Sequence, residues 1–238
     1  MSKVITLVFW KRPQYAKRVL DHLAGCKGIE NYHLVIQLDG PPMQKMHDLC
    51  STIHFTSASV MQFDRNMGCN HSTKTALHRG FELADYVIHV EEDVILAPDS
   101  LQFFEWAEQF GSDHSLLNIA ALRHPDGWLP DHGPFPLGQE VEKKVKREGA
   151  FSCWGWSTWR DRWSELEKNW STGTDRGLSW DIRVEEMRRK WNSSQLMPYV
   201  SRIMNIGAEG GVHRGDYLLP YWAGSPGFIM PNNYYIVT

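Results

Sequence analysis

Several features that mark zinc-binding, secreted or membrane proteins are scarce or missing in this sequence of 238 residues. The four cysteines form no Cys-x-x-Cys pair, so the sequence indicates neither zinc-ligand spacing nor a disulfide framework. The apolar run near the start, Val4 to Trp10, is too short to span a membrane, and no signal-peptide cleavage pattern accompanies it. We therefore expect a cytoplasmic protein with reduced thiols and no membrane span.

A strong charge of either sign is also missing. The chain has 25 Lys and Arg against 28 Asp and Glu, which gives a net charge of -3. This balance offers no electrostatic reason to expect nucleic acid or an anionic membrane as a partner. Tryptophan, by contrast, is abundant at 11 residues, which indicates either a bulky core or stacking surfaces for sugars or bases.

Strand-like and helix-like segments alternate through the first half of the chain. Apolar runs predict strands at 4–9, 32–40, 59–63, 86–90 and 115–123. Helical spacing, with glycines or polar residues at the ends, predicts helices at 15–25, 43–50, 68–85 and 99–111. Strands that alternate with helices indicate an α/β fold with a parallel sheet and helices on both of its faces.

The second half of the chain has a different character. Residues 124–138 are rich in Pro, Gly and His and predict a long loop, and 140–151 alternates as a strand or hairpin arm would. From Trp154 onward the sequence is Trp-rich with helical periodicity, and its end is loop-like and extended. We therefore predict an α/β subdomain at 1–123 and an irregular subdomain at 124–238 that packs on it within one domain.

Polar side chains follow three of the predicted strands. Lys11 and Arg12 come after the first strand, Asp39 ends the second, and the acids Glu91 to Asp93 follow the strand at 86–90. Ligands of parallel sheets bind beyond the carboxyl ends of the strands. Three polar strand ends at this edge therefore predict a ligand site rather than three unrelated solvated loops.

The three consecutive acids Glu91, Glu92 and Asp93 suit a hard cation. In an extended segment residues two apart point the same way, so Glu91 and Asp93 are expected to face one pocket and Glu92 the other side. Carboxylates together with phosphate oxygens are the ligands that Mg²⁺ or Mn²⁺ takes. A charged strand end before a capped helix stays open as the alternative.

In this context the sequence resembles glycosyltransferases of the GT-A fold, and more closely the N-acetylglucosaminyltransferase I family. There an acidic triplet is followed by a hydrophobic residue, a turn similar to Ala-Pro-Asp and an aromatic-rich helix, as in "VEEDVILAPDSLQFFEWA". Other segments are similar in the same order, over about residues 1–215: "LVFWKRPQYAKRVLDHL", "VIQLDG", "FSCWGWSTWRDRWSELEKNW", "SWD" and "SRIMNIGAEGGVH".

The sequence departs from this family in three ways. The triplet reads Glu-Glu-Asp instead of Glu-Asp-Asp, which lengthens the middle side chain. Trp180-Asp181-Ile182 stands where the family has Trp-Asp-Asp, so a single acid is left at that place. The family's membrane anchor is missing, which makes the chain more similar to soluble bacterial or viral relatives, whose acceptor need not be an N-glycan.

The resemblance implies a mixed, mostly parallel GT-A sheet flanked by helices, and a metal-dependent, inverting transfer from a UDP-sugar to a hydroxyl of a carbohydrate or glycoconjugate. Asp93 and His213 are the expected ligands of Mn²⁺ or Mg²⁺. Asp39 is expected to accept a hydrogen bond from the uracil imide, although Asp-Gly-Pro is also a turn signal. The residues expected on the donor are Arg12, Asp39, Arg65, Asn66, Glu91 and Glu92.

The resemblance also implies a catalytic base at Asp181, since an ionised carboxylate can take the proton of the acceptor hydroxyl. A helix N-cap is the structural alternative for Asp181, and Glu185 and Glu186 are the alternative bases. Trp154, Trp156 and Trp159 are candidates for an acceptor platform, but we expect core packing for at least two of them.

Two other functions are compatible with parts of the sequence. A nucleotidyltransferase would also use acids beside a sheet, but it would need a Gly-rich loop after the first strand, and "FWKRPQ" has no glycine. A carbohydrate-binding module could use the tryptophans, but it would not need acids at a strand end.

Overall fold

The computed structural model describes residues 3–122, 140–170, 179–207, 222–225 and 230–237. Its strands are β1 Lys3–Phe9, β2 Tyr32–Leu38, β3 Ser57–Gln62, β4 Tyr86–Val90, β5 Val94–Leu96, β6 Leu116–Ala120, β7 Lys144–Glu148, β8 Trp156–Trp159, β9 Ser194–Pro198, β10 Ile203–Asn205 and β11 Tyr235–Val237. Its helices are α1 Pro13–Ala24, α2 Gln44–Ser51, α3 Cys69–Leu83, α4 Ser100–Glu108, α5 Arg160–Lys168 and α6 Trp180–Lys190, with 3-10 turns η1 Ile29–Asn31, η2 Gln109–Ser112 and η3 Glu140–Lys143.

Nine strands form one sheet in the order β11-β7-β9-β6-β8-β4-β1-β2-β3, and β5 pairs separately with β10. The pairs β1–β2, β1–β4, β2–β3, β6–β9 and β7–β11 are parallel, and β8 runs antiparallel to both of its neighbours. The predicted α/β class with a mixed, mostly parallel sheet is therefore confirmed. Strands from both halves of the sequence share this sheet.

The prediction of helix from Trp154 onward is wrong at its start, because residues 156–159 form strand β8 between β4 and β6. All four side chains of β8 are buried. Its two polar side chains have partners there, since Tyr86 Oη lies 2.5 Å from Ser157 Oγ and Thr158 Oγ1 donates to the Leu117 carbonyl at 2.6 Å. A buried Trp-Ser-Thr-Trp segment packs well on a pleated surface, which overrides the helical spacing.

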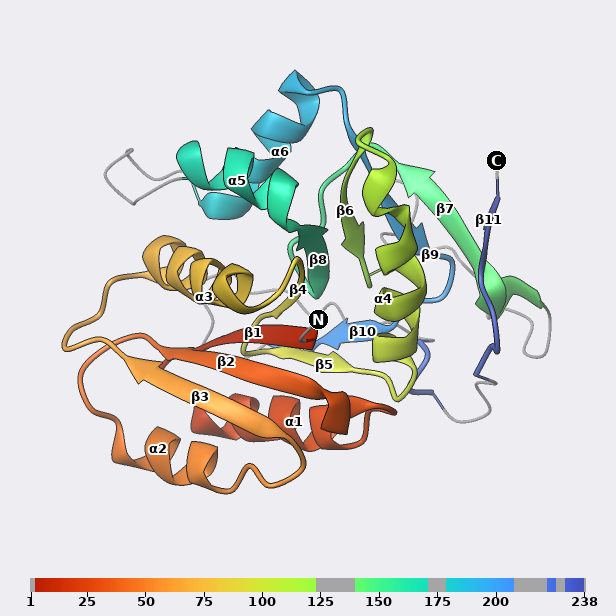
Figure 1. Ribbon diagram of the computed structural model, residues 1–238. Coiled ribbons are helices and arrows are strands. Elements are labelled where there is room, and N and C mark those ends of the chain that lie inside the picture. The colour runs from red at the N-terminus through yellow and green to blue at the C-terminus, as the bar shows by residue number, and fades with distance from the viewer. Residues whose placement is uncertain (1–2, 123–139, 171–178, 208–221, 226–229, 238) are drawn as a thin grey trace.

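Helices cover both faces of the sheet, with α1 and α2 on one side of β1 to β3 and α3 on the other (Figure 1). The close approach of α3 depends on Gly80, where an added Cβ would lie 2.6 Å from Thr6 Cγ2 of β1. None of the helices in the described part of the chain combines the length and apolar character that a bilayer span needs.

Four of the tryptophans pack together in the core on the α3 face of the sheet. Trp156, Trp163, Trp170 and Trp180 are all buried there, and their rings stack or meet edge to face at 5.2–5.9 Å. Trp159 is buried in the core on the opposite face. The expected core packing is therefore confirmed for Trp156 and Trp159, which supply no sugar platform, and Trp154 is half-buried against the core.

Candidate active site

Arg12 and two of the three acids meet at the carboxyl edge of the parallel strands. Arg12 Nε donates to Glu92 Oε1 at 2.5 Å, and Arg12 Nη2 donates to Asp93 Oδ2 at 2.9 Å. The second oxygen of Glu92 accepts from the Trp10 backbone N–H at 2.7 Å. These contacts join the end of β1 to the segment after β4, because the two strands are parallel neighbours in the sheet.

The three acids do not alternate as expected. Glu92 and Asp93 share Arg12, whereas Glu91 contacts His89 Nε2 at 3.2 Å. The physical reason is that β4 ends at Val90 and the next residues turn, with the Val94 N–H donating to the Glu91 carbonyl. The alternation of an extended chain therefore stops before the triplet.

A strained turn places Arg12. Lys11 has a φ of 57°, and the Arg12 N–H donates to the Trp10 carbonyl at 2.8 Å, which closes a γ-turn around Lys11. A non-glycine residue in this conformation is uncommon and costs free energy, so the surrounding contacts must hold it. One such contact is the Lys11 ammonium, which lies 4.2 Å from the centre of the Trp10 ring.

When ionised, the three carboxylates of Glu91, Glu92 and Asp93 carry more negative charge than the single guanidinium of Arg12 neutralises. Burial raises the pKa of Glu92 to about 7, although the Trp10 N–H and Arg12 lower it. Burial and the neighbouring Glu91 also raise the pKa of Asp93 above its usual range. An additional cation at this edge would favour the ionised carboxylates.

Asp93 is suited to hold a divalent cation as a single protein ligand. Its Oδ2 is bound to Arg12, and among the described residues its Oδ1 has one long contact, 3.4 Å from Asn205 Nδ2. A Cβ at Gly207 would lie 2.3 Å from Asp93 Oδ2, so a glycine there lets the carboxylate lie against the backbone. Within the described residues no three His, Cys, Asp or Glu side chains form a metal cluster, so a cation on Asp93 would need further ligands, such as phosphate oxygens.

The segment 203–207 reaches Asp93 through an antiparallel pairing that the sequence did not predict. Strand β10 pairs with β5, and beyond it the Ile206 N–H donates to the Asp93 carbonyl at 2.8 Å. Gly207 N–H then donates to Asn205 Oδ1 at 2.8 Å. The expected metal ligand His213 lies outside the described residues.

Asp39 organises the loop before α3. Its carboxylate accepts from the Met67 N–H at 2.6 Å, the Gly68 N–H at 3.0 Å and Asn66 Nδ2 at 2.9 Å. The backbone N–H groups of Met67 and Gly68 are therefore directed to Asp39. A carboxylate has about four acceptor positions, so one remains for a ligand. Arg65 lies exposed in the same loop.

Glu91 and Asp181 lie near the same two thiols. The pKa of Cys69 is raised to about 12, chiefly by desolvation of its sulfur although the residue as a whole is exposed, and both Glu91 and Asp181 contribute to that increase. Burial raises the pKa of Cys153 as well, again with contributions from Asp181 and Glu91. The acid after β4 and the acid of α6 therefore lie within electrostatic range of the same two cysteines.

The first turn of α6 carries Asp181. The N-cap is Ser179, so the alternative that Asp181 itself caps this helix is wrong. Ser179 Oγ donates to Asp181 Oδ1, and the Trp180 N–H donates to Asn70 Oδ1 at 3.0 Å. The second contact fastens the start of α6, with Asp181 in its first turn, to α3.

The two alternative bases are occupied by arginines. Burial alone would raise the pKa of Glu185, but hydrogen bonds from Arg188 and Arg189 lower it to about 2. Glu186 is exposed and pairs with Arg183 at 3.1 Å. A carboxylate held by arginines is a weak proton acceptor, so the structure favours Asp181 over both residues.

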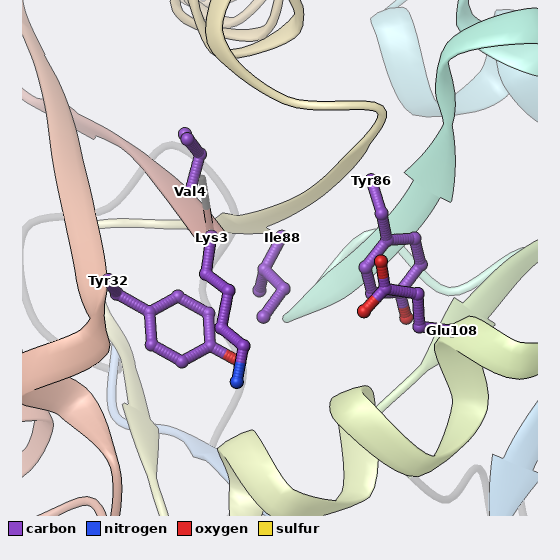
Figure 2. Close-up of a pocket in the computed structure, with 6 residues that line it drawn as sticks. All are labelled: Lys3, Val4, Tyr32, Tyr86, Ile88 and Glu108. Atoms are coloured by element: carbon purple, nitrogen blue, oxygen red, sulfur yellow. The ribbon is translucent and has the colours of Figure 1, made fainter. Parts of the chain in front are cut away.

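A cavity lies at the opposite edge of the sheet, at the amino-terminal ends of β1, β2 and β4 (Figure 2). Its lining residues are Lys3, Val4, Tyr32, Tyr86, Ile88 and Glu108. Its volume of about 20 Å³ accommodates roughly one water molecule. The cavity is therefore too small for a nucleotide sugar, and the carboxyl edge with Glu91, Glu92 and Asp93 remains the candidate ligand site.

Comparison with known proteins agrees with this geometry. The model of the GNT-I family matches residues 57–224, which is more than half of the chain. The chain belongs to the GNT-I family. None of the curated proteins matches this GNT-I-family chain significantly.

Two solved structures have a similar fold. A mannosyltransferase from Pyrobaculum calidifontis, PcManGT in complex with GDP-Man and Mn²⁺, superimposes with a TM-score of 0.58 at 11% identity, over 83% of this chain and 54% of its own. S. aureus TarS, residues 1–349 in complex with UDP-GlcNAc, gives a TM-score of 0.58 at 14% identity, over 85% of this chain and 58% of its own. The GNT-I-family chain thus spans little more than half of these proteins, and the likeness confirms its GT-A fold.

Proposed function

We propose that this protein transfers a sugar from a UDP-sugar to a hydroxyl group of a carbohydrate or glycoconjugate acceptor, with inversion at the anomeric carbon. The observation that carries the proposal is the meeting of Arg12, Glu92 and Asp93 at the carboxyl edge of the sheet, next to Glu91. Asp181 supports it, because Asp181 and Glu91 lie within electrostatic range of the same two cysteines. Family membership supports sugar transfer, and the solved neighbours bind UDP-GlcNAc or GDP-Man.

On the donor side, Arg12 and Asp39 are the residues that would contact the nucleotide. The remaining acceptor position of Asp39 can take the imide N–H of uracil, a donor that cytosine lacks. Arg65 and Asn66 lie in the loop that Asp39 holds, and Glu91 and Glu92 would accept from sugar or ribose hydroxyls. This arrangement favours UDP over CDP as the leaving group.

A divalent ion fits this site, with Asp93 as its protein ligand and His213 as a second candidate. When bound, Mn²⁺ or Mg²⁺ would screen the charge of the diphosphate and stabilise the leaving nucleotide. The raised pKa of Asp93 and its weakly bound Oδ1 support this role.

Asp181 is the proposed base. Its carboxylate takes the proton of the acceptor hydroxyl while that oxygen forms a bond to the anomeric carbon and the bond to the nucleotide diphosphate breaks. A single displacement of this kind inverts the configuration. The hydrogen bond from Ser179 Oγ fixes the Asp181 side chain, which limits the conformational freedom lost in the reaction.

Thermal unfolding with nucleotide sugars and Mn²⁺ tests the proposal. We expect a UDP-sugar with Mn²⁺ to raise the melting temperature, since a ligand of the folded state stabilises it. Chelator should remove most of the increase, and Asp93→Ala should do the same. If no nucleotide or nucleotide sugar changes the melting temperature in either condition, the proposed function is wrong. The burial of Trp156 and Trp159 already removes the main support for a carbohydrate-binding module.

A further inference from the structure

His89 is a buried residue of β4 for which the proposed transfer has no role. Its side chain has no solvent exposure. Nδ1 lies 2.9 Å from Thr6 Oγ1, and Nε2 lies 3.2 Å from Glu91 Oε1. The ring meets Trp156 and Trp180 near edge-on, at 6.3 Å and 6.0 Å between centroids.

The sheet itself creates these contacts. Thr6 of β1 and His89 of β4 are register partners, and His89 is the partner of Trp156 in β8. The chain turns after Val90, and Glu91 then reaches back to His89 Nε2. The row Thr6, His89 and Glu91 therefore runs from the middle of the sheet to its acidic edge.

The proton on Nε2 decides whether the ring can hold Glu91. With Thr6 Oγ1 donating to Nδ1, the Nε2–H of the imidazole donates to the Glu91 carboxylate. If Thr6 instead donated to the Ile88 carbonyl, at the longer distance of 3.3 Å, a neutral ring would carry its proton on Nδ1 and Nε2 would face Glu91 with no proton. The shorter contact of Thr6 with Nδ1 favours the first arrangement.

We infer that His89 is a positioning residue, which holds the Glu91 carboxylate at the place where the donor sugar binds. The inference rests on the proposed function. Glu91 has three side-chain torsions and its side chain is 17% exposed, so without a partner it would sample several rotamers. The contact with His89 keeps the Glu91 carboxylate apart from Glu92 and Asp93, which bind Arg12. Glu91 then lies within electrostatic range of the two thiols that Asp181 also influences. A fixed carboxylate loses less entropy when it accepts from a sugar hydroxyl.

Two amide substitutions separate the two contacts of the ring. The amide nitrogen of Gln can replace Nε2, so His89→Gln keeps a donor for Glu91. The shorter Asn amide replaces Nδ1, so His89→Asn keeps Thr6 and leaves Glu91 without its donor. Thr6→Val is a third variant, which preserves shape and removes the hydroxyl that fixes the tautomer.

The test is calorimetric binding of UDP and of UDP-GlcNAc, UDP-Glc and UDP-Gal, each with Mn²⁺. We expect His89→Asn to weaken the best UDP-sugar about tenfold and to leave UDP unchanged, with His89→Gln close to wild type and Thr6→Val in between. In a Glu91→Ala background, which removes the acceptor of the Nε2–H, His89→Asn should have no further effect on sugar binding. A purely structural role would weaken UDP and UDP-sugar equally and would persist in that background, and either result overturns the inference.

The unfolding free energies of the wild type, of His89→Asn, of Glu91→Ala and of the double variant separate failure of this inference from failure of the proposed function. A hydrogen bond between His89 and Glu91 makes the two substitutions non-additive in stability, with or without a nucleotide. If the wild type binds none of the UDP-sugars but this coupling is present, the proposed function is wrong and the contact stands. If the wild type binds a UDP-sugar and the stability effects add, the positioning role of His89 is wrong.

Discussion

The two acid pairs at the carboxyl edge of the sheet have similar composition and different surroundings. Glu92 and Asp93 share the guanidinium of Arg12, and burial raises the pKa of both. Glu91 and Asp181 lie instead near two protonated thiols, with a neutral donor from His89 on Glu91. The first pair is built around a cation, whereas no ion pair with Lys or Arg is found for the second pair within the part of the chain that the structure describes.

The different surroundings of the two pairs indicate different roles, cation binding for the first pair and proton transfer for the second. Carboxylates that already neutralise an arginine and still carry excess charge suit the binding of a further cation with its phosphates. A carboxylate beside neutral groups suits proton uptake, because no fixed positive charge opposes it. The predictions below test whether the two pairs differ as this comparison requires.

The largest effect is expected at Asp181. Asp181→Asn keeps an oxygen for the Ser179 hydroxyl, so the melting temperature and UDP affinity should be nearly unchanged. Single-turnover transfer should fall by about 10²- to 10⁴-fold, since the amide cannot take the proton. Glu186→Gln, an exposed acid of the same helix, is the control and should retain full activity. An active Asp181→Asn variant would move the base elsewhere.

The next effect is expected at Asp93. Asp93→Asn should remove the enhancement of UDP binding by Mn²⁺, about tenfold or more by calorimetry, while binding in chelator changes little. Its folding stability should not fall, because burial disfavours the charge of this group. Asp48→Asn, at an exposed acid of α2, serves as the control. Equal responses of Asp93→Asn and wild type to Mn²⁺ would contradict the role of the first pair.

Asp39 belongs to neither acid pair, and its substitution tests whether the donor-binding site extends to the end of β2. Asp39→Ala should cost about 1–3 kcal/mol of stability, because the Met67 and Gly68 N–H groups lose their acceptor. If Asp39 also contacts uracil, UDP should lose several-fold more affinity than CDP in the same variant. Equal losses for the two nucleotides would reduce Asp39 to a loop anchor.

The sequence was sufficient for the sheet from β1 to β4 and for the acidic edge, because local periodicity and strand-end polarity are both visible in one dimension. It was insufficient for β8, because the Trp-Ser-Thr-Trp segment leads directly into a helix and has no strand pattern of its own. The segment becomes a strand because it pairs with β4 on one side and β6 on the other. It also missed the His89 contact with Glu91 and the Asn205–Gly207 approach to Asp93. The His89–Glu91 contact joins residues two apart and depends on the turn after Val90, which interrupts the expected alternation. The contact of Asn205 with Asp93 joins residues 112 apart, a pairing that no local pattern contains.

The smallest effect is expected at Glu185, the acid of α6 that resembles the first pair in having arginine partners. Its pKa is lowered to about 2, below the usual value of about 4.3 for Glu in the unfolded chain. Its contribution to stability is therefore present above pH 4.3 and disappears as the pH falls toward 2. Glu185→Gln should lower the unfolding free energy by about 1 kcal/mol at pH 7 and by progressively less below pH 4, with transfer at pH 7 preserved. Urea unfolding of both proteins between pH 3 and pH 7 measures this difference. A Glu185→Gln variant that keeps its stability but loses transfer would instead make Glu185 the base, and the contrast between the two acid pairs would then no longer identify the catalytic one.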